Sequence, residues 1–301
     1  MNNLVSSSSW EKRKIRMAAT WNLYKETRVG LIGIYLLCFF VVMAIASVIP
    51  PHIHEMYIPL YGTDPSIIGV SGPSQTHFLG TDFAGRDIFS QLLEGAKWAL
   101  LIGVTAALAS VVVSTIVGLV SGYYGGTIDS ILQRLADIIM ALPAFPLIVL
   151  IGAILKGMNI WNIVILFCVM GWPGASKVIR AQVLSLKERP FVDSARICGA
   201  SDARIIFRHI APNVLPLAFL YMTFGVTGAI LTEASLSFIG LGDPMSVSWG
   251  MMLHWCHTTG FVFTAPFWVL PPGFCITLLA LSFYLIGIGT EQITNPRLRQ
   301  R

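Results

Sequence analysis

Residues 98–122 read WALLIGVTAALASVVVSTIVGLVSG, a run of 25 residues without Asp, Glu, Lys or Arg. A helix needs about 20 apolar residues to cross the hydrocarbon core of a bilayer. In lipid such a segment must satisfy its own backbone hydrogen bonds, which a helix of this length does. The stretch therefore predicts a transmembrane helix, and with it a helical membrane protein.

Five further uncharged apolar runs lie along the 301 residues of the chain. The six expected spans are 29–49, 98–122, 138–155, 160–176, 214–232 and 267–289. The composition agrees, because 55% of the residues are hydrophobic, only 12% are charged and the mean hydropathy is +0.72, whereas soluble domains carry about 25% charged residues. We expect an all-α integral membrane protein with one membrane domain and no tandem repeat.

The distribution of basic residues predicts the orientation, since Lys and Arg are retained on the cytoplasmic side. With the N-terminus inside, 17 of the 20 Lys and Arg residues lie inside and three lie outside. Both termini are therefore expected in the cytoplasm. The net charge of +5 reflects this topology and contact with anionic lipid, and it indicates no nucleic-acid partner.

Two segments flank the first run. Residues 1–28 form a basic, aromatic tail that suits a helix on the inner membrane surface, with a disordered tail as the alternative for the first nine residues. The run 29–49 could be a signal peptide cleaved after Ala44-Ile45-Ala46, although its 21 residues favour a retained anchor.

Residues 50–97 are rich in proline and are expected to form an irregular extracytoplasmic lobe. Their five acids against two bases agree with the outer side. In this lobe Arg86, Asp82 and Asp87 are expected to form a polar network that anchors it to the second span, with a contact to a binding protein as the alternative. The membrane core is expected over 98–290, and a cytoplasmic tail over 291–301.

No catalytic or metal site is predicted. The five cysteines show no CxxC pair and are typical of small packing residues. The segment His254-Trp255-Cys256-His257 lacks the third or fourth ligand that a metal site needs, and a nickel site on histidines of the outer lobe remains a minor alternative. The sequence contains no HExxH motif and no Ser-His-Asp arrangement that would indicate hydrolytic chemistry.

The third run contains Pro143 and Pro146, and each proline frees a backbone carbonyl, so a kink is expected. Glu233 follows an uncharged stretch and would cost about 2.5–3.5 kcal/mol at mid-membrane. It therefore faces a polar cavity or lies near the outer interface. Candidate residues for a translocation path are Pro143, Phe145, Met222 and Glu233.

Between the fourth and fifth runs, residues 193–213 read DSARICGASDARIIFRHIAPN. Pro190 can open a short helix in which Phe191, Ala195 and Cys198 share a face. Gly199 should break it. A second helix, capped by Ser201, should place an apolar stripe opposite two arginines and end near Pro212; the stripe residues are Ala203, Ile206, Phe207 and Ile210.

Helices this short are marginal alone, so these two must dock, either on another protein or on their own bundle. The pattern Asp193-Ser194-Ala195, then Gly199, then Pro212, resembles the EAA motif of permease subunits of bacterial and archaeal ABC importers. The motif departs in having Asp and Ser where Glu and Ala are usual. In that family the motif is a coupling helix that inserts into a cytoplasmic ATPase subunit. The resemblance assigns coupling, within about 190–210, to Asp193, Ala195, Gly199, Ala200, Ser201, Asp202 and Arg204.

Four more blocks resemble the second permease of dipeptide, oligopeptide and nickel importers, the DppC/OppC type. They are FLGTDFAGRDIFSQLLEGAKWALLIG (78–103), EASLSFIGLG (233–242), SWGMML (248–253) and NPRLR (295–299). The resemblance implies a MetI-like permease fold of type I ABC importers. It also implies a second homologous permease, two ATPase subunits, an extracytoplasmic binding protein and short peptides as the substrate.

The sequence contains no GxxxxGK[ST] phosphate loop. ATP and Mg²⁺ are therefore expected on the partner ATPase subunits, not on this chain. Alternatives are the same machinery moving nickel complexes or oligosaccharides and, from a different class, a secondary transporter that acts alone.

Overall fold

The computed structural model describes residues 24–25, 27–47, 67, 69–155, 158–243 and 246–294. The expected surface helix before residue 24 and most of the lobe over 48–66 lie outside this part. The elements are α2 (Arg28–Ala46), α3 (Ile88–Tyr124), α4 (Gly126–Ala141), α5 (Ala144–Ile154), α6 (Ile160–Lys187), α7 (Pro190–Ile197), α8 (Asp202–Arg204), η2 (Ile205–Ile210), α9 (Ala211–Phe238), α10 (Trp249–Thr258) and α11 (Pro266–Thr294).

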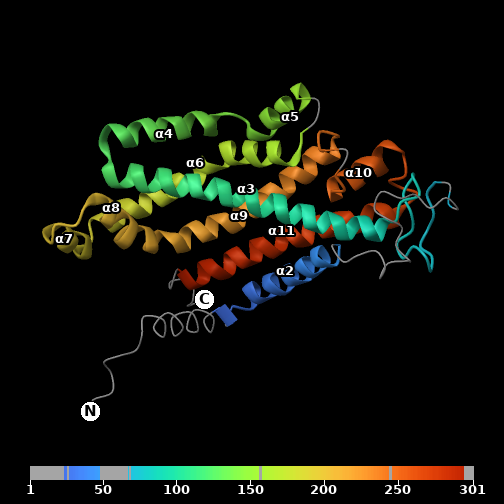
Figure 1. The fold of residues 1–301 in the computed structure, drawn as a ribbon, viewed down its shortest axis with the longest axis horizontal. Coiled ribbons are helices and arrows are strands. Elements are labelled where there is room, and N and C mark those ends of the chain that lie inside the picture. The colour runs from blue at the N-terminus through green and yellow to red at the C-terminus, as the bar shows by residue number, and fades with distance from the viewer. Residues whose placement is uncertain are drawn as a thin grey trace, which may run out of the picture.

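The long helices lie side by side in an elongated bundle (Figure 1). α3 packs along α6 and α9, and α11 packs along α9 and α2. We call the end of the bundle that carries α7 the inner end, and the end that carries residues 69–87 the outer end. In the described part five helical stretches are long and apolar enough to cross a membrane, or six if α4 and α5 form one bent span.

Glycines allow α3 and α6 to approach closely. A Cβ atom on Gly118 would lie 2.5 Å from Cγ2 of Ile179, and one on Gly122 would lie 2.8 Å from Cβ of Val183. Small residues at such contacts let the backbones of membrane helices pack against each other. These two glycines therefore fix α6 against the inner half of α3.

The kink predicted at the prolines of the run 138–155 is present, and it separates two helices. The chain forms α4, then a break at Leu142 and Pro143, then α5 at an angle of 76° to α4. Leu142 is extended, with φ −80° and ψ 136°, because the residue before a proline disfavours the α conformation. Pro146 lies in the first turn of α5, where its missing N–H costs nothing, so only Pro143 makes the break.

The second span begins ten residues earlier than predicted, so residues 88–97 belong to α3 and not to the outer lobe. The Asp87 carboxylate caps α3 by accepting the backbone N–H of Ser90 at 2.7 Å. One turn further on, Lys97 pairs with Glu94. Because the cap and the ion pair satisfy these polar groups, the helix continues beyond the uncharged run.

The helix that leads into the fifth span does not end near Pro212. Residues 202–238 form one continuous helical stretch with a π-helical turn, η2, just before the proline. In this turn the N–H of Ala211 bonds to the carbonyl of Ile206. Since Pro212 has no N–H to donate, the helix widens locally and continues.

The predicted polar network at the outer end is confirmed for Arg86 and Asp82. Nε of Arg86 donates to Oδ2 of Asp82 at 2.7 Å, and Nε2 of Gln91 on α3 donates to the same oxygen at 3.1 Å. Asp87 binds His77 instead of Arg86, with 2.9 Å between Oδ1 and Nδ1. The loop of residues 69–87 is thereby tied to the start of α3.

Candidate functional site

The inner end carries a sharp corner where α7 meets α8 (Figure 1). Pro190 is the first residue of α7, and Gly199 follows its end with φ 76°. The N–H of Gly199 bonds to the carbonyl of Arg196 at 2.9 Å, and that of Ala200 to the carbonyl of Ala195 at 3.0 Å. This is a Schellman motif, which requires a left-handed residue at the glycine position. Gly199 therefore breaks the helix as predicted.

One side of the corner is anchored in a buried cluster at the inner ends of the long helices. Val192, Ile205 and Ile210 are fully buried there. They pack with Tyr123 of α3 and Ile179 of α6, among other residues. The corner is thus held firmly on the bundle.

The predicted faces of the two short helices are buried against the bundle only in part. Phe191 and Cys198 are exposed, and the residue of α7 that is buried is Val192. In the second helix Ile205 is buried instead of Ala203 and Phe207, because the π-helical turn shifts the register of the apolar stripe.

Two large apolar side chains point away from the bundle on either side of Gly199. Ile197 is 87% exposed and Phe207 is 73% exposed. No Cβ contact within 4 Å would hinder a side chain at Gly199, so the corner between them is open. Two large apolar side chains exposed at such a corner are typical of a protein–protein contact.

Tyr123, which the sequence gave no reason to select, connects the corner to α3. Its hydroxyl donates to Oδ1 of Asp202 at 2.7 Å. The guanidinium of Arg196 lies 5.9 Å from the centre of its ring. One side chain at the inner end of α3 thus contacts both helices of the corner. Its position in Tyr-Tyr-Gly-Gly, at the end of a span, was the available signal.

The seven residues assigned to coupling lie together at this corner. Ala195 and Ala200 are half-buried against the inner cluster, while Ser201 and Arg204 are exposed. Asp193 is exposed and lies 3.5 Å from Arg196. Their role in coupling stays a prediction.

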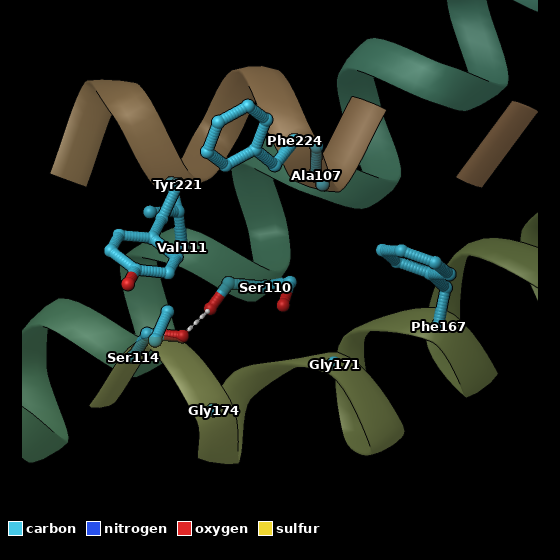
Figure 2. A pocket seen from close by; sticks show the side chains of 11 residues that line it. Ala107, Ser110, Val111, Ser114, Phe167, Gly171, Gly174, Tyr221 and Phe224 are labelled. Carbon is cyan, nitrogen blue, oxygen red and sulfur yellow. Dashed lines mark hydrogen bonds between the residues drawn. The ribbon is translucent and has the colours of Figure 1, made fainter. Parts of the chain in front are cut away.

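A cavity of about 270 Å³ lies between α3, α6 and α9 (Figure 2). Ser110 and Ser114 come from α3, Gly171 and Gly174 from α6, and Tyr221 from α9. Oγ of Ser114 lies 2.8 Å from the carbonyl of Ser110 and 2.9 Å from that of Trp172. Of the described residues that line the cavity, none is charged.

The candidate path residues do not line this cavity. Pro143 and Phe145 are exposed at the break between α4 and α5, and Met222 is half-buried beside the cavity residue Tyr221. Glu233 is buried near the outer end of α9, where it accepts a hydrogen bond of 2.7 Å from Oγ of Ser237.

No group of three or more His, Cys, Asp or Glu side chains in the described ranges could hold a metal ion. The segment His254-Trp255-Cys256-His257, considered above from its sequence as a metal site, lies on α10. In it, Nδ1 of His254 lies 2.8 Å from the carbonyl oxygen of Phe238. His254 thus contacts the end of α9.

Comparison with known proteins gives consistent results. The dipeptide transport permease DppC of Alkalihalophilus pseudofirmus is 36% identical over 277 residues, which cover 91% of this chain and 88% of that protein. The oligopeptide transport permease OppC of Bacillus subtilis is 33% identical over 98% of this chain and 92% of its own length.

A solved structure of the methionine ABC transporter MetNI in an inward-facing conformation matches with a TM-score of 0.49 and 18% identity. The match covers 68% of this chain and 94% of that chain. Residues 114–300 match the model of a protein family described as the binding-protein-dependent transport system inner membrane component. Together with the sequence identity to DppC and OppC and the bundle of apolar helices, this match shows that the chain belongs to the family of binding-protein-dependent transport system inner membrane components.

Proposed function

We propose that the chain forms half of the translocation path of an ATP-driven importer of short peptides in the plasma membrane of a prokaryote. A second homologous permease supplies the other half. Two cytoplasmic ATPase subunits hold ATP and Mg²⁺, and an extracytoplasmic binding protein delivers the substrate. The names of the relatives, which refer to dipeptide and oligopeptide transport, support peptides as the substrate class.

The observation that carries the proposal is the open corner at the inner end. Ile197 and Phe207 expose apolar surface there, although Val192 and Ile205 anchor the same segment in the bundle. A firmly anchored segment that presents apolar side chains outward suits a rigid docking element. We infer that the ATPase subunit covers this surface and that motion of the subunit is passed to α3 and α9 through the corner.

The cavity between α3, α6 and α9 supports a role in passage. It presents serine hydroxyls and aromatic rings but no charge. Hydroxyl groups can exchange hydrogen bonds with a passing peptide backbone, and an uncharged wall does not hold one side-chain type strongly. The arrangement suits a path that leaves substrate selection to the binding protein.

The exposed thiol of Cys198, beside Gly199, provides a direct test. In a variant with the other four cysteines replaced by alanine, a membrane-impermeant maleimide should modify Cys198 from the cytoplasmic side only. Bound ATPase subunits should slow the modification about tenfold or more, as expected when an interface excludes solvent from its centre.

The matched control is the same protein with Ile197→Asp, which should weaken ATPase binding and restore the labelling rate of the free permease. Labelling from the outside would contradict the orientation. Equal labelling with and without the ATPase subunits would contradict docking at the corner. Uptake into liposomes by this chain alone, driven by an ion gradient, would favour the secondary transporter instead.

A further inference from the structure

Helix α4 exposes an apolar face along its length. Ile128, Ile131, Leu135 and Ile138 are all exposed, at helical spacings of three and four residues, and Ala136 is the only residue of α4 that is fully buried. A helix in water rarely exposes such a continuous aliphatic stripe. This face therefore lies against lipid or against another subunit.

The opposite side of α4 opens onto a polar cleft of about 610 Å³ between α4 and α6. Two acids in this cleft are already paired with bases of α6. Nε and Nη2 of Arg180 donate to the two carboxylate oxygens of Asp129 at 2.6 Å and 2.5 Å, and Lys177 pairs with Asp137. These pairs connect α4 to α6.

Arg134 is the third base of the cleft. Within the described part of the chain it makes neither an ion pair nor a hydrogen bond. With three bases and two acids, the cleft carries one surplus positive charge. Because the two acids already form ion pairs with Arg180 and Lys177, the guanidinium of Arg134 can pair with one further anion.

The depth of Arg134 points to the membrane surface. It lies four residues before Ile138, where the uncharged run 138–155 begins, and so about 6 Å, roughly one helical turn, toward the inner end from the start of that run. An arginine at such a depth extends its guanidinium toward the phosphates of the nearer leaflet, because an unpaired charge in hydrocarbon is costly.

An apolar groove of about 350 Å³ joins the cleft at Arg134. Ile131, Leu135 and Ile138 line it, and it shares Ser130 and Arg134 with the polar cleft. A cationic pocket and an aliphatic groove that meet at one arginine match the two parts of an amphiphile.

We propose that α4 and α6 bind one anionic phospholipid from the leaflet at the inner end. Its phosphate pairs with Arg134, and one acyl chain lies along Ile131, Leu135 and Ile138. Basic pockets between membrane helices on the cytoplasmic side recognise anionic headgroups in this way. A zwitterionic lipid adds its own cation and leaves the surplus charge uncompensated, so it binds more weakly.

The test uses the transporter purified in detergent through a tag on this chain, with added phosphatidylglycerol or phosphatidylcholine and native mass spectrometry of the retained lipid. The wild-type protein should retain phosphatidylglycerol in preference to phosphatidylcholine. Arg134→Gln should reduce phosphatidylglycerol retention about fivefold, the effect expected for one basic residue near a charged headgroup. Arg134→Lys, which keeps the charge, should preserve most of it.

Lys187→Gln is the matched control, because Lys187 lies on α6 but does not line the cleft; it should leave retention unchanged. A photo-crosslinking side chain at position 135 should form an adduct with lipid. Equal retention by wild type and Arg134→Gln, or equal retention of the two lipids, overturns the proposal. A crosslink from position 135 to another polypeptide also overturns it, since a subunit then covers the groove.

Discussion

Two tight turns at opposite ends of the bundle each contain a glycine with a positive φ, but the side chains around the two glycines differ. Gly85 in the outer loop has φ 74°, and Gly199 at the inner corner has φ 76°. Around Gly85 the carboxylate of Asp82 accepts the N–H groups of Ala84 and Arg86 at 2.9 Å and 3.0 Å. Around Gly199 the charged and apolar side chains are largely exposed.

We infer from this difference that the outer turn is structural and that the inner turn is a docking site. The outer loop satisfies its polar groups internally, and Asp82, Asp87 and His77 are buried. The inner corner leaves Ile197 and Phe207 in the open. Exposed apolar surface of this kind is typical of a protein–protein contact, so we expect a partner to dock at the inner turn.

The largest effect is expected from removing Asp87. Asp87→Ala deletes the acceptor used by His77 and by the N–H and hydroxyl of Ser90. Loss of a buried paired charge that also caps a helix should lower the free energy of unfolding by about 3 kcal/mol or more. Thermal unfolding in detergent would measure it.

The matched change at the inner corner is Asp193→Ala. Asp193 is exposed and its distance to Arg196 is 3.5 Å, so stability should change by less than about 1 kcal/mol. If the two variants lost equal stability, the contrast between a closed outer loop and an open inner corner would be wrong.

An intermediate effect is expected from Tyr123→Phe. The substitution removes the hydroxyl that donates to Asp202 at 2.7 Å and should cost about 1.5 kcal/mol, because the acceptor is a carboxylate. It should also lower transport-coupled ATPase activity, since Tyr123 contacts both helices of the corner.

Tyr124→Phe is the control, because the adjacent tyrosine is exposed and, within the described residues, the hydrogen bond to Asp202 comes from Tyr123; little change is expected. Normal coupling in Tyr123→Phe, at reduced stability, would limit Tyr123 to a structural role.

A smaller effect on stability than that of Tyr123→Phe is expected at Gly199. Gly199→Ala places a Cβ in a left-handed conformation and should cost about 1 kcal/mol, with no clash, because nothing lies within 4 Å of the added atom. Gly273→Ala in α11 also meets nothing within 4 Å but needs no positive φ, so it should be neutral or slightly stabilising. The difference between the unfolding midpoints of Gly199→Ala and Gly273→Ala measures the cost of the left-handed conformation.

Gly199→Arg causes the same backbone strain as Gly199→Ala and also places a large side chain at the corner. It should abolish coupled ATPase activity, while Gly199→Ala retains most of it, because only the arginine obstructs the docking surface. Full coupling in Gly199→Arg would exclude close approach of a partner at this corner.

Local patterns determined a large part of this structure. The uncharged runs predicted the long helices, since each such run must become a helix in lipid. Gly199 and Pro190 predicted the corner, because helix breaking and helix initiation depend on single residues. Pro143 predicted a kink, although not that the chain would bend by 76°.

What the sequence could not predict depends on partners far along the chain. α4 did not resemble a span because it carries Asp129, Arg134 and Asp137, and two of these charges are matched only when α6 lies beside it. Arg180 is 51 residues from Asp129, and Tyr123 is 79 residues from Asp202. No local pattern encodes such pairs.

The sequence by itself determined that the chain is a helical membrane protein with a glycine corner on its basic side, because hydropathy, charge and backbone preference act over a few residues. Only the tertiary structure decided which side chains the corner exposes. The π-helical turn before Pro212 changes which residues of this helix face the bundle, so Ile205 is buried and Phe207 is exposed. Packing against α3 and α6 fixes this choice, and packing is a property of the assembled bundle.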